Sequence, residues 1–179
     1  GLSESVISYA RTHAVPEKAD EIVYVGNVKP HKGLKTLLAA FSRLEGETKL
    51  KIIGEKEHFL TGLDLDESAY RNVEFTGKLT DEELLPAIAR AKYLVLPSVY
   101  EGFGLPPLEA LVLGTQPIVS DIPVFREVYE GFPVVFFQGE DGLARALSRP
   151  PEEINCREEV LSRYSYARCA KTILEHIKA

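Results

Sequence analysis

The chain has 179 residues and a formal net charge of −6, with 27% charged residues of both signs. This length fits one domain with a substantial hydrophobic core. The acidic balance argues against a nucleic-acid-binding surface, which carries a basic excess, and no apolar run approaches the roughly 20 residues that span a bilayer.

The first residue of the chain and its cysteines bear on its origin and on its compartment in the cell. Because the chain begins with Gly1 and contains no methionine, we expect it to be a piece of a longer protein or a chain processed at its N-terminus. Cys156 and Cys169 lack paired metal-ligand spacing, and idle thiols suit a reducing cytosol, so we expect a cytoplasmic protein. Residues 1–20 show no clear pattern and are interpreted as a lead-in segment, which leaves 21–179 as the domain.

From about residue 21, short β-rich runs alternate with helical patterns. The predicted strands are 22–25, 50–53, 73–75, 93–96, 117–119 and 134–137. The predicted helices are 34–44, a segment that follows the capping box at 80–83, one that starts at Pro106-Pro107, 151–163 and 165–178. Pro86 predicts a kink or an early break in the second helix. This alternation indicates an α/β fold, a Rossmann-like parallel sheet of about six strands with helices on both faces.

The loop after the first strand concentrates positive charge in an otherwise acidic chain. Lys29, His31, Lys32 and Lys35 fall within seven residues, beside two glycines and directly before a helix. Glycines let the backbone approach a ligand closely, and the N-terminal end of a helix attracts anions. These features indicate a phosphate site, and a solvated lysine loop is the alternative interpretation.

The loop after the fourth strand carries two carboxylates and an aromatic residue framed by glycines. Glu101 precedes Phe103 and Gly104, and the helix that follows Leu105 holds Glu109. Backbone amides there can donate to a ligand oxygen, and the glutamates can accept hydrogen bonds from sugar hydroxyls. Alternatively, Gly-Phe-Gly forms a tight turn, and Glu109, in a first helical turn, complements the helix dipole. Ligands of open parallel sheets bind beyond the carboxyl ends of the strands, so both loops belong to the candidate site.

Taken together, these segments resemble the C-terminal domain of family-four glycosyltransferases across residues 21–178. The matching motifs are Tyr24-Val25-Gly26, Lys32-Gly33 before a Leu-Leu-x-Ala-Phe helix, Phe75-Thr76-Gly77-Lys78-Leu79, Leu96-Pro97-Ser98 through Glu109-Ala110, Gly114-Thr115, Ser120-Asp121-Ile122-Pro123, Arg126-Glu127-Val128 and Tyr164-Ser165-Tyr166. The resemblance implies one half of a GT-B fold, the half that binds a nucleotide-diphosphate sugar. It also implies that the N-terminal domain of that fold, which binds the acceptor, is absent from this chain.

The resemblance assigns the reacting end of the donor to two side chains. Lys32 is expected to bind the diphosphate and Glu101 the transferred sugar, and these are the candidate catalytic residues. Many family members carry arginine where this chain has Asn27, which leaves Lys32, with help from Lys29 or Lys35, to neutralise the leaving group. The remaining expected donor contacts are the backbone of Phe103, Gly104 and Leu105 at the sugar, Glu109 at the ribose hydroxyls, Lys78 and Leu79 at the base, and the neighbouring Ser98.

The activity that the resemblance implies is sugar transfer with retention of configuration, without a metal or another cofactor. The donor would be a UDP- or GDP-linked sugar, and the acceptor is unknown. Asp64-Leu65-Asp66 matches the Asp-x-Asp of metal-dependent transferases with another fold, but its polar surroundings indicate a solvated loop. We expect this chain alone to transfer little or no sugar, and any peripheral membrane association to run through the absent half.

Three alternative functions stay open to different degrees. The first is a non-catalytic nucleotide-sugar-binding module of the same fold, and the second is an epimerase or phosphorylase that shares the fold. The third, a glycoside hydrolase with paired carboxylates, is disfavoured. A first helical turn, where Glu109 is expected, favours the ionised form of a carboxyl group, which is wrong for a general acid.

Overall fold

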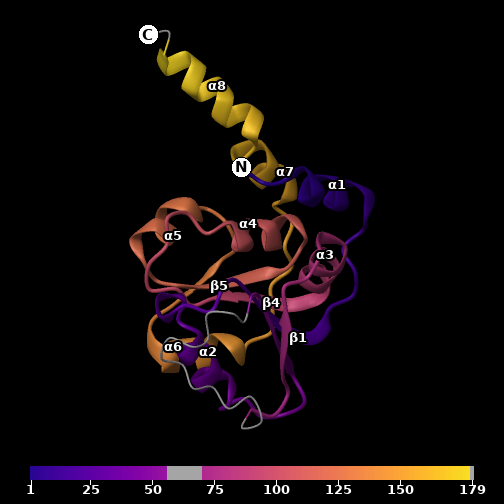
Figure 1. The fold of residues 1–179 in the computed structure, drawn as a ribbon, viewed down its shortest axis with the longest axis vertical. Coiled ribbons are helices and arrows are strands. Elements are labelled where there is room, and N and C mark those ends of the chain that lie inside the picture. The colour runs from indigo at the N-terminus through magenta and orange to yellow at the C-terminus, as the bar shows by residue number, and fades with distance from the viewer. Residues whose placement is uncertain (56–69, 178–179) are drawn as a thin grey trace.

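Figure 1 shows the computed structural model of the chain, which describes residues 1–55 and 70–177. Within these residues, six parallel strands form a sheet in the order β3-β2-β1-β4-β5-β6. The strands are β1 (Ala19–Val25), β2 (Lys49–Ile53), β3 (Val73–Gly77), β4 (Ala91–Leu96), β5 (Gln116–Ser120) and β6 (Val135–Phe137). The Rossmann-like parallel sheet predicted from the sequence is therefore confirmed.

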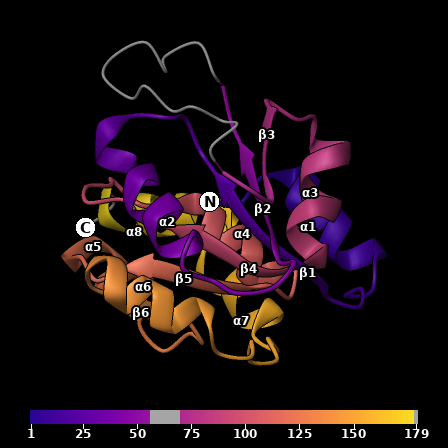
Figure 2. The ribbon, with the colours of Figure 1, turned by 90° about the horizontal axis from the view of Figure 1, so that it is seen from below.

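Helices cover both faces of the sheet (Figures 1 and 2). They are α1 (Glu4–Thr12), the 3-10 helix η1 (Pro30–Lys32), α2 (Leu34–Phe41), α3 (Asp81–Arg90), α4 (Leu105–Val112), α5 (Pro123–Val128), α6 (Gly139–Leu147), α7 (Arg157–Arg163) and α8 (Tyr166–Ile177). The core on one face is formed with α2 and α6. The core on the other face is formed with α1, α3, α4, α5 and α7.

The central strands supply side chains to both cores in alternation. On β1, Ile22 and Tyr24 pack with α2 and α6, whereas Val23 packs with the helices of the opposite face. On β4, Tyr93 and Leu94 divide in the same way. Because both faces are covered, these strands are apolar at consecutive positions, as is typical of strands in a buried parallel sheet.

A helix that the sequence analysis did not predict lies within residues 1–20. Ser3 caps α1 by accepting a hydrogen bond from the Val6 amide at 3.4 Å. Leu2, Val6 and Ala10 are buried in the same core as α3 and α4. The short apolar stripe of α1 is interrupted by serine and tyrosine, so its helical period is weak in the sequence.

The predicted early break at Pro86 is wrong, because α3 continues to Arg90. The predicted capping box is confirmed: the Thr80 amide donates to Glu83 Oε2 at 3.0 Å. A proline leaves the carbonyl four residues earlier without its helical donor. Here that residue is Glu82, which lies in the exposed first turn, where water can take the place of the missing donor.

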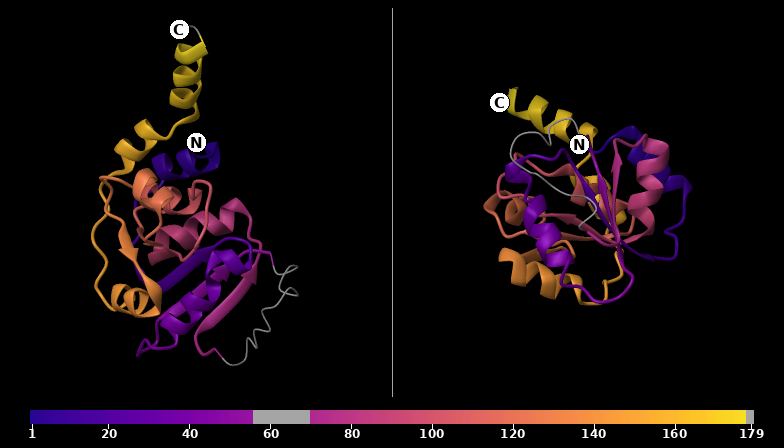
Figure 3. Two further views of the ribbon diagram at one scale, coloured as in Figure 1. Left: turned by 90° about the vertical axis from the view of Figure 1, so that its left-hand side faces the viewer. Right: turned by 60° about the horizontal axis from the view of Figure 1, so that its bottom comes forward.

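The C-terminal helices differ in length and packing from the predictions. The helix predicted over 151–163 is confined to α7, and α5 and α6 were not predicted as helices. Helix α8 extends away from the sheet (Figures 1 and 3), and its apolar side chains Ile173, Leu174 and Ile177 are exposed. No helix in the described part of the chain combines the length and apolar character needed to cross a membrane.

Candidate functional site

The strand order reverses between β1 and β4, which places the loops that leave these two strands side by side. The Val99 amide donates to the His31 carbonyl at 2.9 Å, so a backbone hydrogen bond joins the loops. Gly33 adopts a left-handed φ of 69°, and a Cβ there would lie 1.9 Å from the Pro97 carbonyl oxygen. The two loops that the sequence analysis singled out are therefore in direct backbone contact, and only glycine fits at this crossing.

The two candidate catalytic residues meet at this crossing. Lys32 Nζ donates to Glu101 Oε1 at 2.6 Å, although the residues are 69 positions apart in the sequence. Ser98, which is fully buried, donates its hydroxyl to the same oxygen at 2.8 Å. The side chains of Lys32 and Glu101 are 21% and 12% exposed, so this pair is shielded from bulk water but still reachable from it.

The remaining part of the β4 loop leads directly into α4. Gly104 has a φ of 82° and precedes Leu105, the first residue of the helix. The Tyr129 hydroxyl donates to the Gly104 carbonyl from inside the domain. Phe103 is exposed on one side and packs edge-on against the Tyr164 ring, with 5.8 Å between ring centroids. The three predicted backbone contacts at the sugar therefore lie on one rigidly held turn.

Glu109 is in the second turn of α4, so the prediction that it lies in the first turn is wrong. The helix begins at Leu105, one residue earlier than expected, which makes Glu109 its fifth residue. Burial raises the pKa of the Glu109 carboxyl above its ordinary value, and the Asp81 carboxylate raises it further. The helix-dipole argument against an acid role for Glu109 therefore fails, and the hydrolase alternative loses that particular objection.

The two residues expected at the base lie where β3 ends. The Gly54 amide donates to the Gly77 carbonyl at 2.9 Å, and a Cβ on Gly54 would lie 2.1 Å from the Gly26 carbonyl oxygen. This packing brings the ends of β2 and β3 against the β1 loop. Lys78 projects outward, with Nζ 3.7 Å from Glu55, while Leu79 packs against the core beneath.

Asn27 is exposed on the β1 loop. It is the residue at whose position many members of the resembled family carry arginine. Its carbonyl accepts hydrogen bonds from the Tyr24 hydroxyl at 3.0 Å and from the Lys29 amide at 3.1 Å. The nearby lysines Lys29 and Lys35 are exposed, unlike Lys32. Of these three lysines, of which Lys35 lies in the first turn of α2, Lys32 is the one that the structure joins to the β4 loop.

Tyr24 and Tyr129 are the residues at the site that the sequence analysis did not assign to it. Both are fully buried, and each donates its hydroxyl to a backbone carbonyl in one of the two loops. Burial is the main reason that the pKa of each is raised, and the Glu101 carboxylate raises both further. In the sequence they are indistinguishable from apolar core residues, so no local signal could have identified them.

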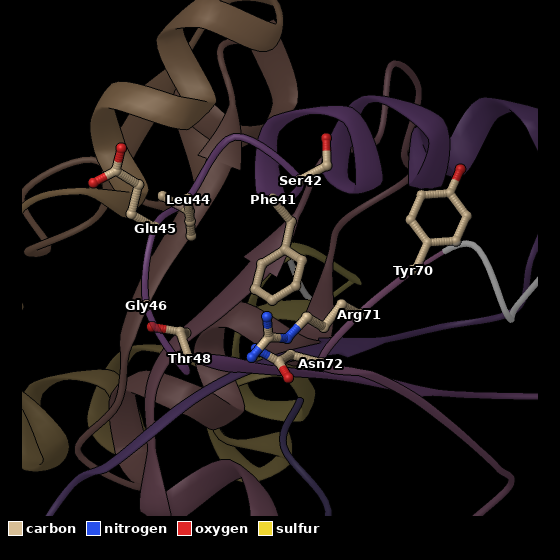
Figure 4. A pocket seen from close by; sticks show the side chains of 9 residues that line it. All are labelled: Phe41, Ser42, Leu44, Glu45, Gly46, Thr48, Tyr70, Arg71 and Asn72. Carbon is tan, nitrogen blue, oxygen red and sulfur yellow. The ribbon is translucent and has the colours of Figure 1, made fainter.

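Among residues 1–55 and 70–177, no group of three or more histidine, cysteine, aspartate or glutamate side chains could hold a metal ion. The Asp64-Leu65-Asp66 motif lies outside the described residues. A hollow of about 340 Å³, shown in Figure 4, includes Thr48 and Asn72, which directly precede β2 and β3. It is therefore at the opposite end of the sheet from the candidate site.

Comparison with known proteins assigns this chain to a family. The model of the family described as glycosyl transferases group 1 matches residues 7–149. An O-antigen chain mannosyltransferase of Salmonella typhimurium is 34% identical over 115 residues, which are 63% of this chain and 33% of that protein. A serotype-specific mannosyltransferase of Escherichia coli is 34% identical over 144 residues, which are 72% of this chain and 18% of that protein.

Solved structures share the fold. Sucrose-phosphate synthase from Thermosynechococcus elongatus superposes with a TM-score of 0.73 at 25% identity, over 96% of this chain and 48% of that one. The Anabaena protein HepE in complex with UDP and glucose superposes with a TM-score of 0.74 at 16% identity, over 99% of this chain and 53% of that one. The chain spans about half or less of the length of each protein compared. The family model and the shared fold agree with the resemblance drawn from the motifs, and this chain belongs to the group 1 glycosyl transferases, with the architecture of one half of a GT-B fold.

Proposed function

We propose that this chain binds the nucleoside diphosphate of a sugar donor between the β1 and β4 loops and acts as the donor-binding half of a glycosyltransferase. The observation that carries the proposal is the 2.6 Å contact between Lys32 and Glu101 across the switch point of the sheet. A cation for the diphosphate and an acceptor for sugar hydroxyls are thereby held together in one partly buried place. The UDP and glucose named in the Anabaena complex are ligands of the corresponding chemistry.

The chemistry that Lys32 would perform follows from where charge develops. When the bond between sugar and diphosphate breaks, negative charge builds on the phosphate oxygens of the leaving group. The Lys32 ammonium and the Leu105 amide, which is the one N–H among the first three residues of α4 because Pro106 and Pro107 have none, stabilise such charge. This stabilisation needs no divalent cation, which is why we propose transfer without a metal or another cofactor. Retention of configuration is proposed on the family resemblance alone.

The two glutamates would recognise different parts of the donor. Glu101 accepts hydrogen bonds from the transferred sugar while Ser98 holds its carboxylate in place at 2.8 Å. Glu109 accepts hydrogen bonds from the ribose hydroxyls. These bonds would replace water that burial has already removed from the Glu109 carboxylate, the same burial that raises its pKa.

Calorimetric titration of the chain with UDP, GDP and ADP, each with and without EDTA, tests the binding proposal. We expect saturable binding of UDP or GDP that EDTA does not change. Failure of all three nucleotides to bind would refute the proposed function, and binding that disappears with EDTA would refute metal independence.

Turnover has to be tested in a protein that also contains an acceptor-binding half. Release of nucleoside diphosphate that depends on an added acceptor is expected there, whereas this chain alone should release almost none. A parent protein that binds the donor without any release would instead support the alternative of a non-catalytic nucleotide-sugar-binding module.

A further inference from the structure

The peptide between Gly104 and Leu105 is held from inside the domain by a tyrosine. Tyr129 follows α5, its side chain is fully buried, and its hydroxyl donates to the Gly104 carbonyl. The fit is tight, because a Cβ on Gly104 would lie 2.7 Å from both the Tyr129 hydroxyl oxygen and the Phe125 ring. The carbonyl of this peptide therefore points inward and has a fixed partner.

The direction of the carbonyl determines the direction of the neighbouring amide. The described peptide bonds are all trans, and in a planar trans peptide the C=O and the following N–H point in opposite directions. Since the Gly104 carbonyl points inward, the Leu105 N–H points outward. Leu105 is the first residue of α4, so its N–H has no acceptor within the helix. An outward donor without a helical acceptor thus lies four residues after Glu101.

The surroundings of Tyr129 keep its hydroxyl in the donor role. Burial raises the pKa of Tyr129, and the Glu101, Tyr164 and Glu109 groups each raise it further. The hydroxyl therefore stays protonated across the physiological pH range and can donate only to the carbonyl that it contacts. The hydrogen bond to Gly104 places the Tyr129 hydroxyl against the inner side of the β4 loop.

We propose that Tyr129 is a positioning residue of the donor site, whose hydroxyl turns the Gly104–Leu105 peptide so that the Leu105 N–H faces the donor diphosphate. The inference rests on the proposed function, since it presumes that a diphosphate binds beside α4. It goes beyond that function by assigning a role to a buried side chain that would touch no part of the donor. Loss of the hydroxyl frees the peptide to rotate, which weakens the contact to phosphate and leaves the contacts to the nucleoside intact.

The test compares Tyr129→Phe with a matched control, Tyr93→Phe. Tyr93 is also a buried tyrosine whose hydroxyl donates to a backbone carbonyl, that of Arg149 at 2.5 Å, but it lies in the other core. UDP and GDP are titrated beside uridine and guanosine. We expect Tyr129→Phe to weaken diphosphate binding about tenfold, the usual effect of losing one hydrogen bond to a charged group, and to change nucleoside binding less than twofold. Tyr93→Phe should change neither.

A second variant removes the amide itself and does not depend on the tyrosine. Leu105→Pro deletes the N–H at a first helical position, where proline is tolerated. It should weaken diphosphate binding to a similar extent, and adding Tyr129→Phe to it should cause no further loss, because both changes act on one contact. Equal losses for diphosphate and nucleoside, or additive losses in the double variant, would overturn the inference. If the unaltered chain binds neither nucleotide, the proposed function itself fails.

Discussion

The Glu101 carboxylate contacts the same ammonium that we propose for the donor diphosphate, so the two anions compete for Lys32. Glu101→Gln removes the negative charge but keeps the length of the side chain and an oxygen that can accept from Ser98. We therefore expect this variant to bind a free nucleoside diphosphate more tightly than the unaltered chain. In a parent protein with an acceptor half, the same change should lower sugar transfer, because the carboxylate would no longer orient the sugar.

The size of the effect follows from the geometry of the pair. Lys32 Nζ and Glu101 Oε1 are 2.6 Å apart, and the side chains are 21% and 12% exposed. A hydrogen bond between charged groups in such partial burial contributes about 1.5–3 kcal/mol. Water and salt still screen the pair to some extent, so the lower end of that range applies. Because about 1.4 kcal/mol corresponds to a factor of ten in affinity, the dissociation constant for UDP or GDP should fall about tenfold.

Isothermal titration of the unaltered chain and of Glu101→Gln with UDP and GDP at low salt measures this change in affinity. The control is Glu21→Gln, since Glu21 pairs with Lys51 at 3.0 Å and with similar exposures of 16% and 25%. That pair lies on β1 and β2 rather than in the loops, so its loss should leave nucleotide affinity unchanged. A tenfold weaker affinity in Glu101→Gln would refute the reasoning, because it would mean that the carboxylate assists diphosphate binding.

Three further substitutions test other parts of the site. Lys32→Ala should weaken UDP or GDP binding at least tenfold in calorimetry and shift the thermal midpoint by only a few degrees. The control is Lys49→Ala, since Lys49 is exposed at the first position of β2, at the opposite end of the sheet, and should leave nucleotide affinity unchanged. Equal losses of affinity in the two variants would contradict the assignment. Glu109→Gln should reduce nucleoside affinity. Folding raises the pKa of Glu109 above 4.5, so the unaltered protein loses stability as pH rises through that raised value, whereas the glutamine variant does not. Denaturation curves from pH 4 to 8 should therefore show the unfolding free energy of the variant increasing relative to that of the unaltered protein as pH rises. A difference that stays constant with pH would contradict this. Gly33→Ala should lower the unfolding free energy by more than about 2 kcal/mol, because its Cβ would lie 1.9 Å from the Pro97 carbonyl oxygen; a loss below about 0.5 kcal/mol would show that the loops can separate easily.

The sheet and the meeting of its loops could be predicted from the sequence because the rules involved are local or topological. Each strand is a short apolar run, most of these runs have glycine, asparagine or proline at one end, and parallel strands place their following loops at one edge. That reasoning was sufficient to bring Lys32 and Glu101 together across 69 residues. Features that depend on single-residue boundaries were harder, as Glu109 shows: one residue of difference in the start of α4 moved it out of the first turn.

The parts that could not be predicted depend on directions in space. The hydroxyls of Tyr24 and Tyr129 reach backbone carbonyls 3 and 25 positions away, respectively, and nothing in a buried tyrosine's sequence neighbourhood indicates which carbonyl it will reach. α1 was missed for a different reason. Its buried face consists of two residues, Val6 and Ala10, and it is stabilised mainly by packing against α3 and α4 rather than by a strong helical pattern.

The backbone hydrogen bond from Val99 to His31, together with the close approach at Gly33, means that the frame of the site is made of main chain. Exposed side chains around that frame, such as Tyr100 and Phe103, can be exchanged without moving it. Under the proposed function, variation of such side chains is therefore a route by which relatives, or an engineer, could alter the sugar that is accepted while the contacts proposed for the diphosphate stay in place.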